Sequence, residues 1–479
     1  MYTNDMMVKR KPLFLFFLMC GLFCAGQVDA HASEQGLVLL LPTGAYAAAG
    51  TLTVIASILL VTCLPKNALS ILFQALPLPL DRAKGKNAQR VSLATSLCAT
   101  ILFLILVFIG FRGPTDPQNN LLPLTIWTVW WIGVFVVQGM VFDVWKWVNP
   151  WTGFLNVLNL GENPIVRIPE KLCAWPAVVI LVCFQVFLLA DIAPSDPQRL
   201  AAVVFGYWIF TLVGIELCGR DPWLQKVECF SIMFRLIGSL RPFHRDGPFR
   251  VGLPGWYALK HAPLDVSEAV FCLVLLTGGS FDGVNETFWW LAQLGINPLE
   301  FPGRSAVIWS STLGLFAAII LLFTLYGASI WVGLKAIENR GSSDRIPYQH
   351  AFNMFAVTLL PIALGYHFAH YLVSFMVQIK FTLSTASDPM ALGWNLFGLG
   401  AIKATTGFLG VPETVKTIWL TQAGVVVVSH VVSVLMGHNI ASKLYGNNKD
   451  VVLIQIGLTV LMIAYTMFGL WLLASPRGI

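Results

Sequence analysis

The sequence is poor in charged residues and in long polar stretches. Asp, Glu, Lys and Arg make up 11% of the 479 residues, against about 25% in ordinary soluble domains. Hydrophobic residues make up 57%, and the mean hydropathy is +0.73. No polar stretch is long enough for a separate globular module. The composition therefore predicts that the lipid bilayer is the main solvent of the chain.

Cysteine motifs are also absent. The chain has nine cysteines but no CxxC and no Cys/His cluster, which argues against a disulfide framework and against thiolate-bound zinc or iron–sulfur centres. The formal net charge of +6 is compatible with a nucleic-acid partner. However, the basic residues lie in short loops between apolar runs, as topology signals do, so we expect no nucleic-acid partner.

Residues 1–30 have the pattern of a cleavable signal peptide. Lys9 and Arg10 begin a basic region, a short apolar run follows, and Val28 to Ala30 form a small-residue cleavage site. Cleavage there makes His31 the first mature residue, and residues 31–479 are expected to form a single transmembrane helical domain.

Ten apolar runs are long enough to cross a bilayer. The chain is therefore predicted to be an all-α polytopic helix bundle. The expected spans are roughly 43–64, 91–111, 121–142, 173–190, 200–217, 264–281, 306–334, 351–379, 417–436 and 451–473.

The distribution of lysine and arginine predicts the orientation of these spans. The basic residues concentrate in alternate loops, most densely from Arg220 to Lys260, and such loops face the cytoplasm. Both mature termini are then periplasmic, and the protein is a multi-pass protein of a bacterial inner membrane.

Two segments outside the spans have helical patterns. Asp221 and Pro222 are typical of a helix start, and apolar residues recur at helical spacing from about 222 to 241. This pattern predicts an amphipathic helix at the cytoplasmic interface. The stretch from Asp282 to Gly295 is expected to form a short outer helix at the lipid headgroups.

Ionisable residues inside spans are expensive and are therefore the first functional candidates. His367 and His370 are three residues apart in the eighth span, so they share one helix face. Pro361 and Gly365 precede them and are expected to bend the helix and free backbone carbonyls. The two imidazoles either hydrogen-bond neighbouring helices or bind a metal ion that faces the periplasm.

Further ligands for such a metal must come from other segments, because two imidazoles are an incomplete set. Asp282 is either a helix cap or a site residue, and Glu286 one turn later is either a solvated rim residue or a ligand. His430 in the ninth span needs a partner or a ligand. His31 adds an imidazole and an α-amino group, unless it is only the residue at which cleavage happens to occur.

Four segments carry a family resemblance: Asn149 to Trp151, Gly219 to Trp223, Ser280 to Gly283, and Tyr366 to Tyr371. Together with a mature start at histidine, they resemble the bacterial integral-membrane proteins named for fenitrothion hydrolase. The resemblance implies hydrolysis of the P–O aryl bond of organophosphorus triesters. It brings no catalytic residues with it, and the HxH pattern of soluble phosphotriesterases is absent.

The residues suggest how such an activity would work on a small apolar substrate that partitions into lipid. A divalent metal held by His367 and His370 would activate a water molecule. Zinc is the first choice, and copper becomes attractive if His31 is a ligand. Asp282 is expected to be a ligand or the general base, and Tyr366 or Tyr371 to donate to developing charge.

Two other classes of function fit the same pattern. Ten helices with a histidine-bearing, proline-containing span also suit a transporter or ion-coupled permease. A membrane copper or haem redox protein is the third possibility, with His370 and His430 as axial ligands.

The orientation is tested with reporter fusions. Fusions at Ile479 and near Gly247 should report opposite compartments, with the fusion at Ile479 outside, because the basic loops hold the Gly247 segment in the cytoplasm. The same compartment for both fusions would contradict the predicted number of spans.

Overall fold

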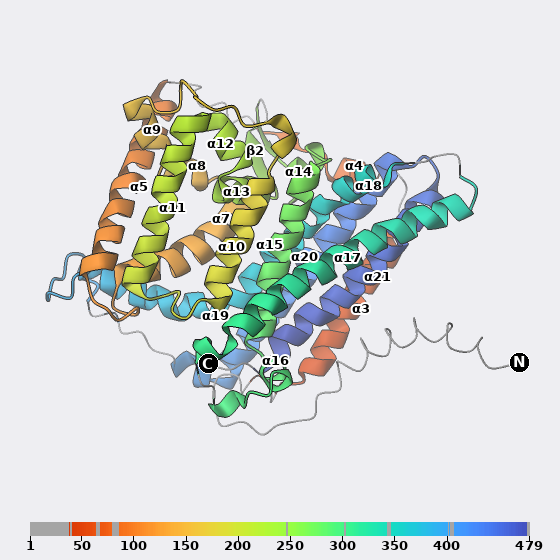
Figure 1. Cartoon of the computed structure of the whole chain (residues 1–479). Coiled ribbons are helices and arrows are strands. Elements are labelled where there is room, and N and C mark those ends of the chain that lie inside the picture. The colour runs from red at the N-terminus through yellow and green to blue at the C-terminus, as the bar shows by residue number, and fades with distance from the viewer. Residues whose placement is uncertain are drawn as a thin grey trace, which may run out of the picture.

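The computed structural model describes residues 38, 41–63, 68–78, 86–245, 248–300, 303–342, 346–400, 402 and 407–476. The signal peptide and His31 lie outside these residues. Within them, ten helical segments are long and apolar enough to cross a membrane, which confirms the predicted all-α polytopic bundle. Figure 1 shows these helices side by side, with the first described helix beginning at the same end of the bundle as the C-terminus.

Besides α15 (Val266–Asn285), six of the spans are each formed by one long α-helix. They are α3 (Thr43–Thr62), α5 (Lys86–Arg112), α10 (Trp175–Ala190), α11 (Pro197–Cys218), α20 (Pro412–Leu444) and α21 (Asn448–Ala474).

The other four spans include α15 and α19 (Leu359–Ser387), which lie at the centre of the bundle. The third span joins α6 (Leu121–Leu124), a π-helix η1 (Thr125–Val134) and α7 (Phe135–Met140). The others are α15 (Val266–Asn285), η4 with α17 (Arg304–Val307 and Ile308–Asn339), and α18, η5 and α19 (Tyr348–Phe355, Ala356–Thr358 and Leu359–Ser387).

Short elements fill the two ends of the bundle. Helices are α4 (Ala68–Leu72), α8 (Trp145–Val148), α9 (Thr152–Leu158), η2 (Glu170–Leu172), α12 (Arg220–Lys226), α13 (Cys229–Gly238), α14 (Trp256–Lys260), α16 (Phe288–Gln293), η3 (Pro298–Glu300) and η6 (Gly407–Gly410). A small antiparallel sheet has the order β1 (Leu76–Pro77), β3 (Phe249–Val251), β2 (Phe243–Arg245).

Two spans form the centre of the bundle. Within the most apolar 18 residues of each span, 83% of the α15 residues and 94% of the α18–α19 residues are buried. The corresponding share in the other eight spans is 17–44%. Helices α15 and α19 carry Asp282, His367 and His370. The central position keeps these costly ionisable groups away from lipid, as the physics of the bilayer requires.

Pro361 affects the backbone one turn before itself. The α18–α19 span changes to 3₁₀ geometry at 356–358 and then continues without interruption through Pro361. Proline has no N–H for the carbonyl four residues earlier, and the neighbouring Thr358 carbonyl accepts a hydrogen bond from the Ser433 hydroxyl at 2.7 Å. The neighbouring helix α20 thus donates to the carbonyl next to the one that Pro361 leaves without a donor.

The segment predicted as one interfacial helix from 222 to 241 differs in the structure. It forms two helices, and α12 begins at Arg220 with Gly219 as its cap rather than Asp221. Glu228 separates them, because its buried carboxylate accepts bonds from the backbone N–H groups of Phe230 and Ser231 and caps α13. Helix α13 is buried along most of its length instead of presenting a polar face.

The outer segment from 282 to 295 also differs. Asp282 lies inside α15, and α16 is capped by Thr287, whose hydroxyl accepts from the Trp290 N–H at 3.1 Å. The interpretation of Asp282 as a cap for the short helix is therefore wrong. Asp265 and Glu268 do form a capping box at the start of α15.

Helices α17 and α21 approach closely because two glycines face the opposite backbone. A Cβ at Gly333 would lie 2.2 Å from the Ile454 carbonyl oxygen, and one at Gly457 would lie 2.2 Å from the Ser329 carbonyl oxygen. Small residues allow this kind of contact, which stabilises helix pairs in membranes by van der Waals packing.

Gly333→Ala and Gly457→Ala should each lower the free energy of unfolding by about 1–3 kcal/mol, because the added methyl must push two backbones apart. Gly424→Ala in α20 is the matched control, since a Cβ there has no neighbour within 4 Å. Thermal unfolding of the purified protein in detergent measures the difference. Equal melting temperatures for Gly333→Ala and Gly424→Ala would contradict the close approach.

Candidate functional site

Asp282 is the buried acid at the centre of the candidate site. It lies in the last turn of α15 and is 8% exposed. Its Oδ2 atom is 3.0 Å from His370 Nε2 and also accepts a hydrogen bond from the Tyr371 hydroxyl. Donors of this kind are what a carboxylate needs when it leaves water, because an unpaired buried charge is very costly.

Tyr366 completes the cluster from the same face of α19. Its ring is stacked on the His370 ring, with centroids 5.6 Å apart and planes 13° apart. Its hydroxyl occupies the space beside Gly283, since a Cβ there would lie 1.9 Å from that oxygen. Gly279, one turn earlier, would place a Cβ 3.7 Å from the same ring. Two glycines of α15 thus form the groove that accepts Tyr366.

These contacts join two of the motifs singled out in the sequence. Asp282 and Gly283 contact Tyr371 and Tyr366, and Phe281 packs against Trp290. Ser280 is 2.5 Å from the Tyr465 hydroxyl of α21. The Ser280 to Gly283 segment is therefore the point at which α15, α19 and α21 meet.

The His367 side chain faces the third span rather than Asp282. Its Nε2 donates to the carbonyl oxygen of Trp131 at 2.9 Å, and its ring packs 4.1 Å from the Phe135 ring. It lines a separate small cavity of about 20 Å³, together with Gln185 and Tyr371. This volume holds about one water molecule. Both rings of the predicted histidine pair thus pack against Tyr371, but their Nε2 atoms have different hydrogen-bond partners.

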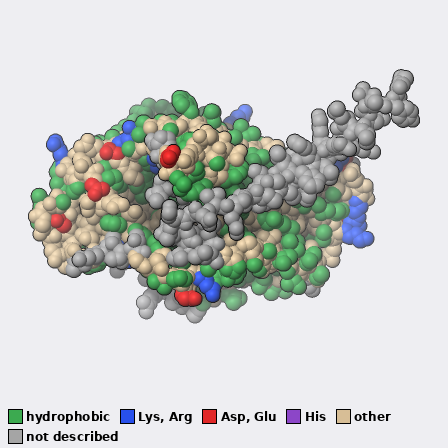
Figure 2. All heavy atoms as spheres, turned by 90° about the horizontal axis from the view of Figure 1, so that it is seen from below, with side chains coloured by type: hydrophobic (Ala, Val, Ile, Leu, Met, Phe, Trp, Pro, Cys, Tyr) green, Lys and Arg blue, Asp and Glu red, His purple; other side chains and the backbone are tan. Residues whose placement is uncertain are grey.

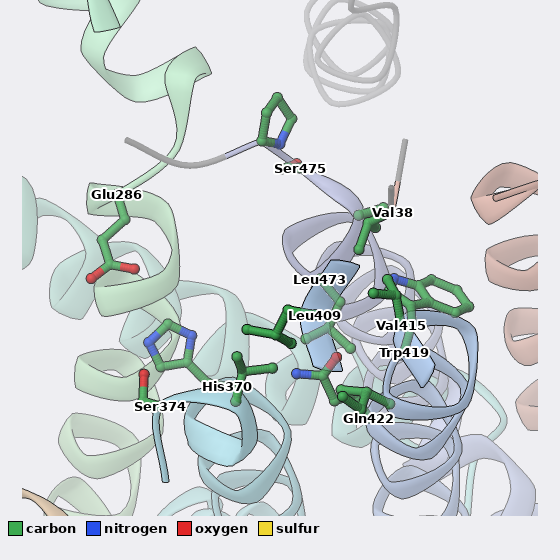
Figure 3. Close-up of a pocket in the computed structure, with 14 residues that line it drawn as sticks. Val38, Glu286, His370, Ser374, Leu409, Val415, Trp419, Gln422, Leu473 and Ser475 are labelled. Carbon is green, nitrogen blue, oxygen red and sulfur yellow. The ribbon is translucent and has the colours of Figure 1, made fainter. Parts of the chain in front are cut away.

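Glu286 lies beside the cluster and faces a larger cavity of about 190 Å³. Figure 3 shows its carboxylate, the His370 imidazole and Ser374 on one side of this cavity, with Trp419 and Gln422 on the other. The remaining lining residues are mostly apolar: Val38, Val373, Leu409, Val415, Ile418, Leu473 and Ala474. Polar and apolar side chains thus share the lining of this cavity.

The cavity is at the end of the bundle where the described chain terminates, because Ser475 and Pro476 also line it. Figure 2 views the molecule from this end, and the charged side chains visible there are few and scattered. The His370 imidazole of the buried cluster around Asp282 also lines this cavity.

His430 is not part of this cluster. Its Nδ1 is bonded to the Val426 carbonyl of its own helix at 2.8 Å, and its Nε2 is buried without a hydrogen-bond partner among the described residues. The nearest aromatic neighbour recorded is Tyr465, at 6.5 Å between ring centroids.

The described residues include no group of three or more His, Cys, Asp or Glu side chains arranged to hold a metal ion. His367 uses Nε2 on a backbone carbonyl, and His31 lies outside the described part. The donor set present is therefore short of a complete zinc or copper site. Metal dependence stays a prediction.

Two features of the site have no signal in the sequence. The groove at Gly279 and Gly283 depends on which helix packs against α15, although a glycine directly after Asp282 marks close backbone approach. The Trp131 carbonyl lies in the π-helix of the third span, and this segment has the same apolar pattern as an α-helix.

The chain matches no protein-family model, no curated protein and no solved structure in any of the three comparisons made. The fold and the site therefore define its class by themselves. It is a polytopic α-helical membrane protein with a carboxylate, imidazole and phenol cluster buried between its two central spans.

The contact between Gly283 and Tyr366 is testable by a double-mutant cycle. Gly283→Ala should lower the free energy of unfolding by about 1–3 kcal/mol, because its methyl overlaps the Tyr366 hydroxyl. Tyr366→Phe removes that hydroxyl, so the double variant should regain most of the loss. Gly279→Ala is the control for alanine in α15. Additive losses in the double variant would show that the two residues do not touch.

Proposed function

We propose that this protein is a membrane-embedded hydrolase of small, apolar organophosphorus triesters, cleaving the P–O aryl bond. The observation that carries the proposal is the Asp282–His370 pair, in which His370 lines a cavity of about 190 Å³. The family resemblance supports the same activity, since two of its four segments supply this pair. We further propose that the cavity faces the periplasm, as the basic-loop distribution predicts.

Substrate access is consistent with the physics of the bilayer. A neutral triester partitions into lipid, and the cavity presents Trp419, Ile418 and Leu473 to an apolar ligand. Its volume of about 190 Å³ is below that of most drug-sized sites. A small dialkyl aryl ester is therefore a better fit than a bulky lipid.

His370 is the proposed general base. A carboxylate can only accept, so the bond to Asp282 puts the proton of a neutral His370 on Nε2, and Nδ1 is then the basic nitrogen. A water oxygen forms a bond to phosphorus while its proton moves to Nδ1, and the bond to the aryl oxygen breaks. The products are a dialkyl phosphate and a phenol, which takes up the proton from His370.

Asp282 and Tyr371 act as positioning residues in this scheme. Asp282 orients the His370 ring and stabilises the imidazolium that forms, while the Tyr371 hydroxyl fixes the carboxylate by donating to it. The expected role of Tyr371 as a donor to the phosphoryl group is replaced by this contact. Tyr366 holds the His370 ring by stacking.

The proposal is tested with p-nitrophenyl diethyl phosphate and protein purified into lipid nanodiscs. His370→Gln should lower kcat/KM by about 10²–10⁴, the usual contribution of a general base. Asp282→Asn should lower it by up to about 10⁴, because the His370 ring loses the carboxylate that orients it. His430→Gln is the matched control, because it replaces another buried membrane histidine outside the cluster. It should change the rate by less than about twofold.

Wild-type hydrolysis rates in Asp282→Asn, or no hydrolysis by the wild type with and without added zinc or copper, would overturn the proposal. Metal analysis of the same samples tests the cofactor prediction separately. Stoichiometric metal that is lost in His367→Ala and His370→Ala would support it. Metal-free protein with full activity would contradict it.

A further inference from the structure

The small sheet lies at the opposite end of the bundle from the Asp282 site, beside α12 and α14 (Figure 1). Its strand β2 carries His244, its strand β3 carries Arg250, and Arg241 lies just before β2. Arg241 and His244 are 8% and 6% exposed. Arginine is rarely buried unless it is paired, so the surroundings of these side chains require an explanation.

One carboxylate stands near these groups. Arg241 Nη1 is 3.6 Å from Asp143 Oδ1, a long contact, and the Asp143 side chain is 43% exposed. Asp143 also accepts a hydrogen bond from Gln138 Nε2 at 3.0 Å. No other ion pair is recorded for Arg241 or Arg250 among the described residues, so these two guanidinium groups face one described carboxylate.

Three buried nitrogen atoms of this patch have no hydrogen-bond partner among the described residues. They are Arg241 Nε, Arg250 Nε and His244 Nε2. The Nε of an arginine always carries a hydrogen. Leaving such a donor buried without an acceptor costs about 1–3 kcal/mol, which favours an acceptor that is supplied from outside the chain.

The tautomer of His244 makes its Nε2 a donor as well. Arg241 Nη2 lies 3.4 Å from His244 Nδ1, and because a guanidinium can only donate, Nδ1 accepts. Burial and the charge of Arg241 lower the pKa of His244 to about 4. The ring is therefore neutral at pH 7, with its hydrogen on Nε2.

The strand register brings these groups to one face. His244 and Arg250 are direct partners across β2 and β3, and opposite residues of an antiparallel pair point to the same side of the sheet. Phe243 and Arg245 alternate to the other, exposed side, where Phe243 stacks on Phe249. The sheet thus separates an exposed face from a donor-rich face, on which His244 is buried and Arg250 is half-buried.

We infer that Arg241, His244 and Arg250 form a binding site for a phosphate-type oxyanion. A phosphate group offers several acceptor oxygens and a negative charge, which two guanidinium groups and an imidazole N–H match. The chemistry is shared by the headgroup of an anionic phospholipid and by a free phosphate. This site is separate from the proposed hydrolase site and does not depend on it.

Ligand-induced stabilisation of the full-length protein tests the site. In phospholipid-free detergent, inorganic phosphate should raise the melting temperature beyond potassium chloride of equal ionic strength, if free phosphate is the ligand. In nanodiscs, phosphatidylglycerol should raise it beyond phosphatidylcholine, if a lipid headgroup is the ligand. A shift in either arm supports the site and identifies the source.

Arg250→Gln and Arg241→Gln should each remove that melting-temperature shift, or raise the ligand concentration needed for half of it at least tenfold. Arg245→Gln is the matched control, since it removes the same charge from the exposed side of β2 and should keep the shift. Asp143→Asn should strengthen binding severalfold by removing the competing carboxylate, a gain that misfolding cannot produce. No shift in either arm, an equal loss in Arg245→Gln, or no gain in Asp143→Asn would overturn the inference.

Discussion

The acceptor role of one buried carboxylate organises the centre of this protein. Asp282 lies between the two most buried spans, and its Oδ2 meets the His370 imidazole and the Tyr371 hydroxyl. A carboxylate inside a bilayer is tolerated only where the protein supplies donors in place of water. The pairing of α15 with α19 is thus a requirement of the charge as well as of packing. The same contact leaves His370 oriented beside a cavity.

Glycines let the helices come close enough for these contacts. Gly283 leaves room for the Tyr366 hydroxyl, and Gly365 lies against Ser429 of α20, where a Cβ would be 2.5 Å from the serine side chain. Gly333 and Gly457 do the same between α17 and α21. Since lipid provides little hydrophobic drive for helix association, such close contacts supply much of the stabilising energy. Site geometry and bundle packing therefore both depend on glycines at close helix contacts.

The spans were predictable from the sequence because the bilayer requires about 20 apolar residues for each crossing. The rule that membrane ionisable groups need partners also selected Asp282, His370 and Tyr371, which the structure brings together. The direction of His367 was not predictable, since it depends on a carbonyl in the π-helix of another span. The break between α12 and α13 was missed for a similar reason, because Glu228 caps α13 from a position that an apolar pattern does not mark. Local periodicity defines helices, whereas side-chain partners depend on which helices meet.

The proposed roles of His370 and Tyr371 depend most directly on Asp282 being an ionised acceptor of two hydrogen bonds. Infrared difference spectroscopy of wild-type protein against Asp282→Asn at neutral pH measures this property. An ionised Asp282 predicts a difference in the carboxylate stretching region and no protonated-carboxyl band in the wild type. A protonated-carboxyl band that shifts in D₂O and is absent from Asp282→Asn would contradict the account.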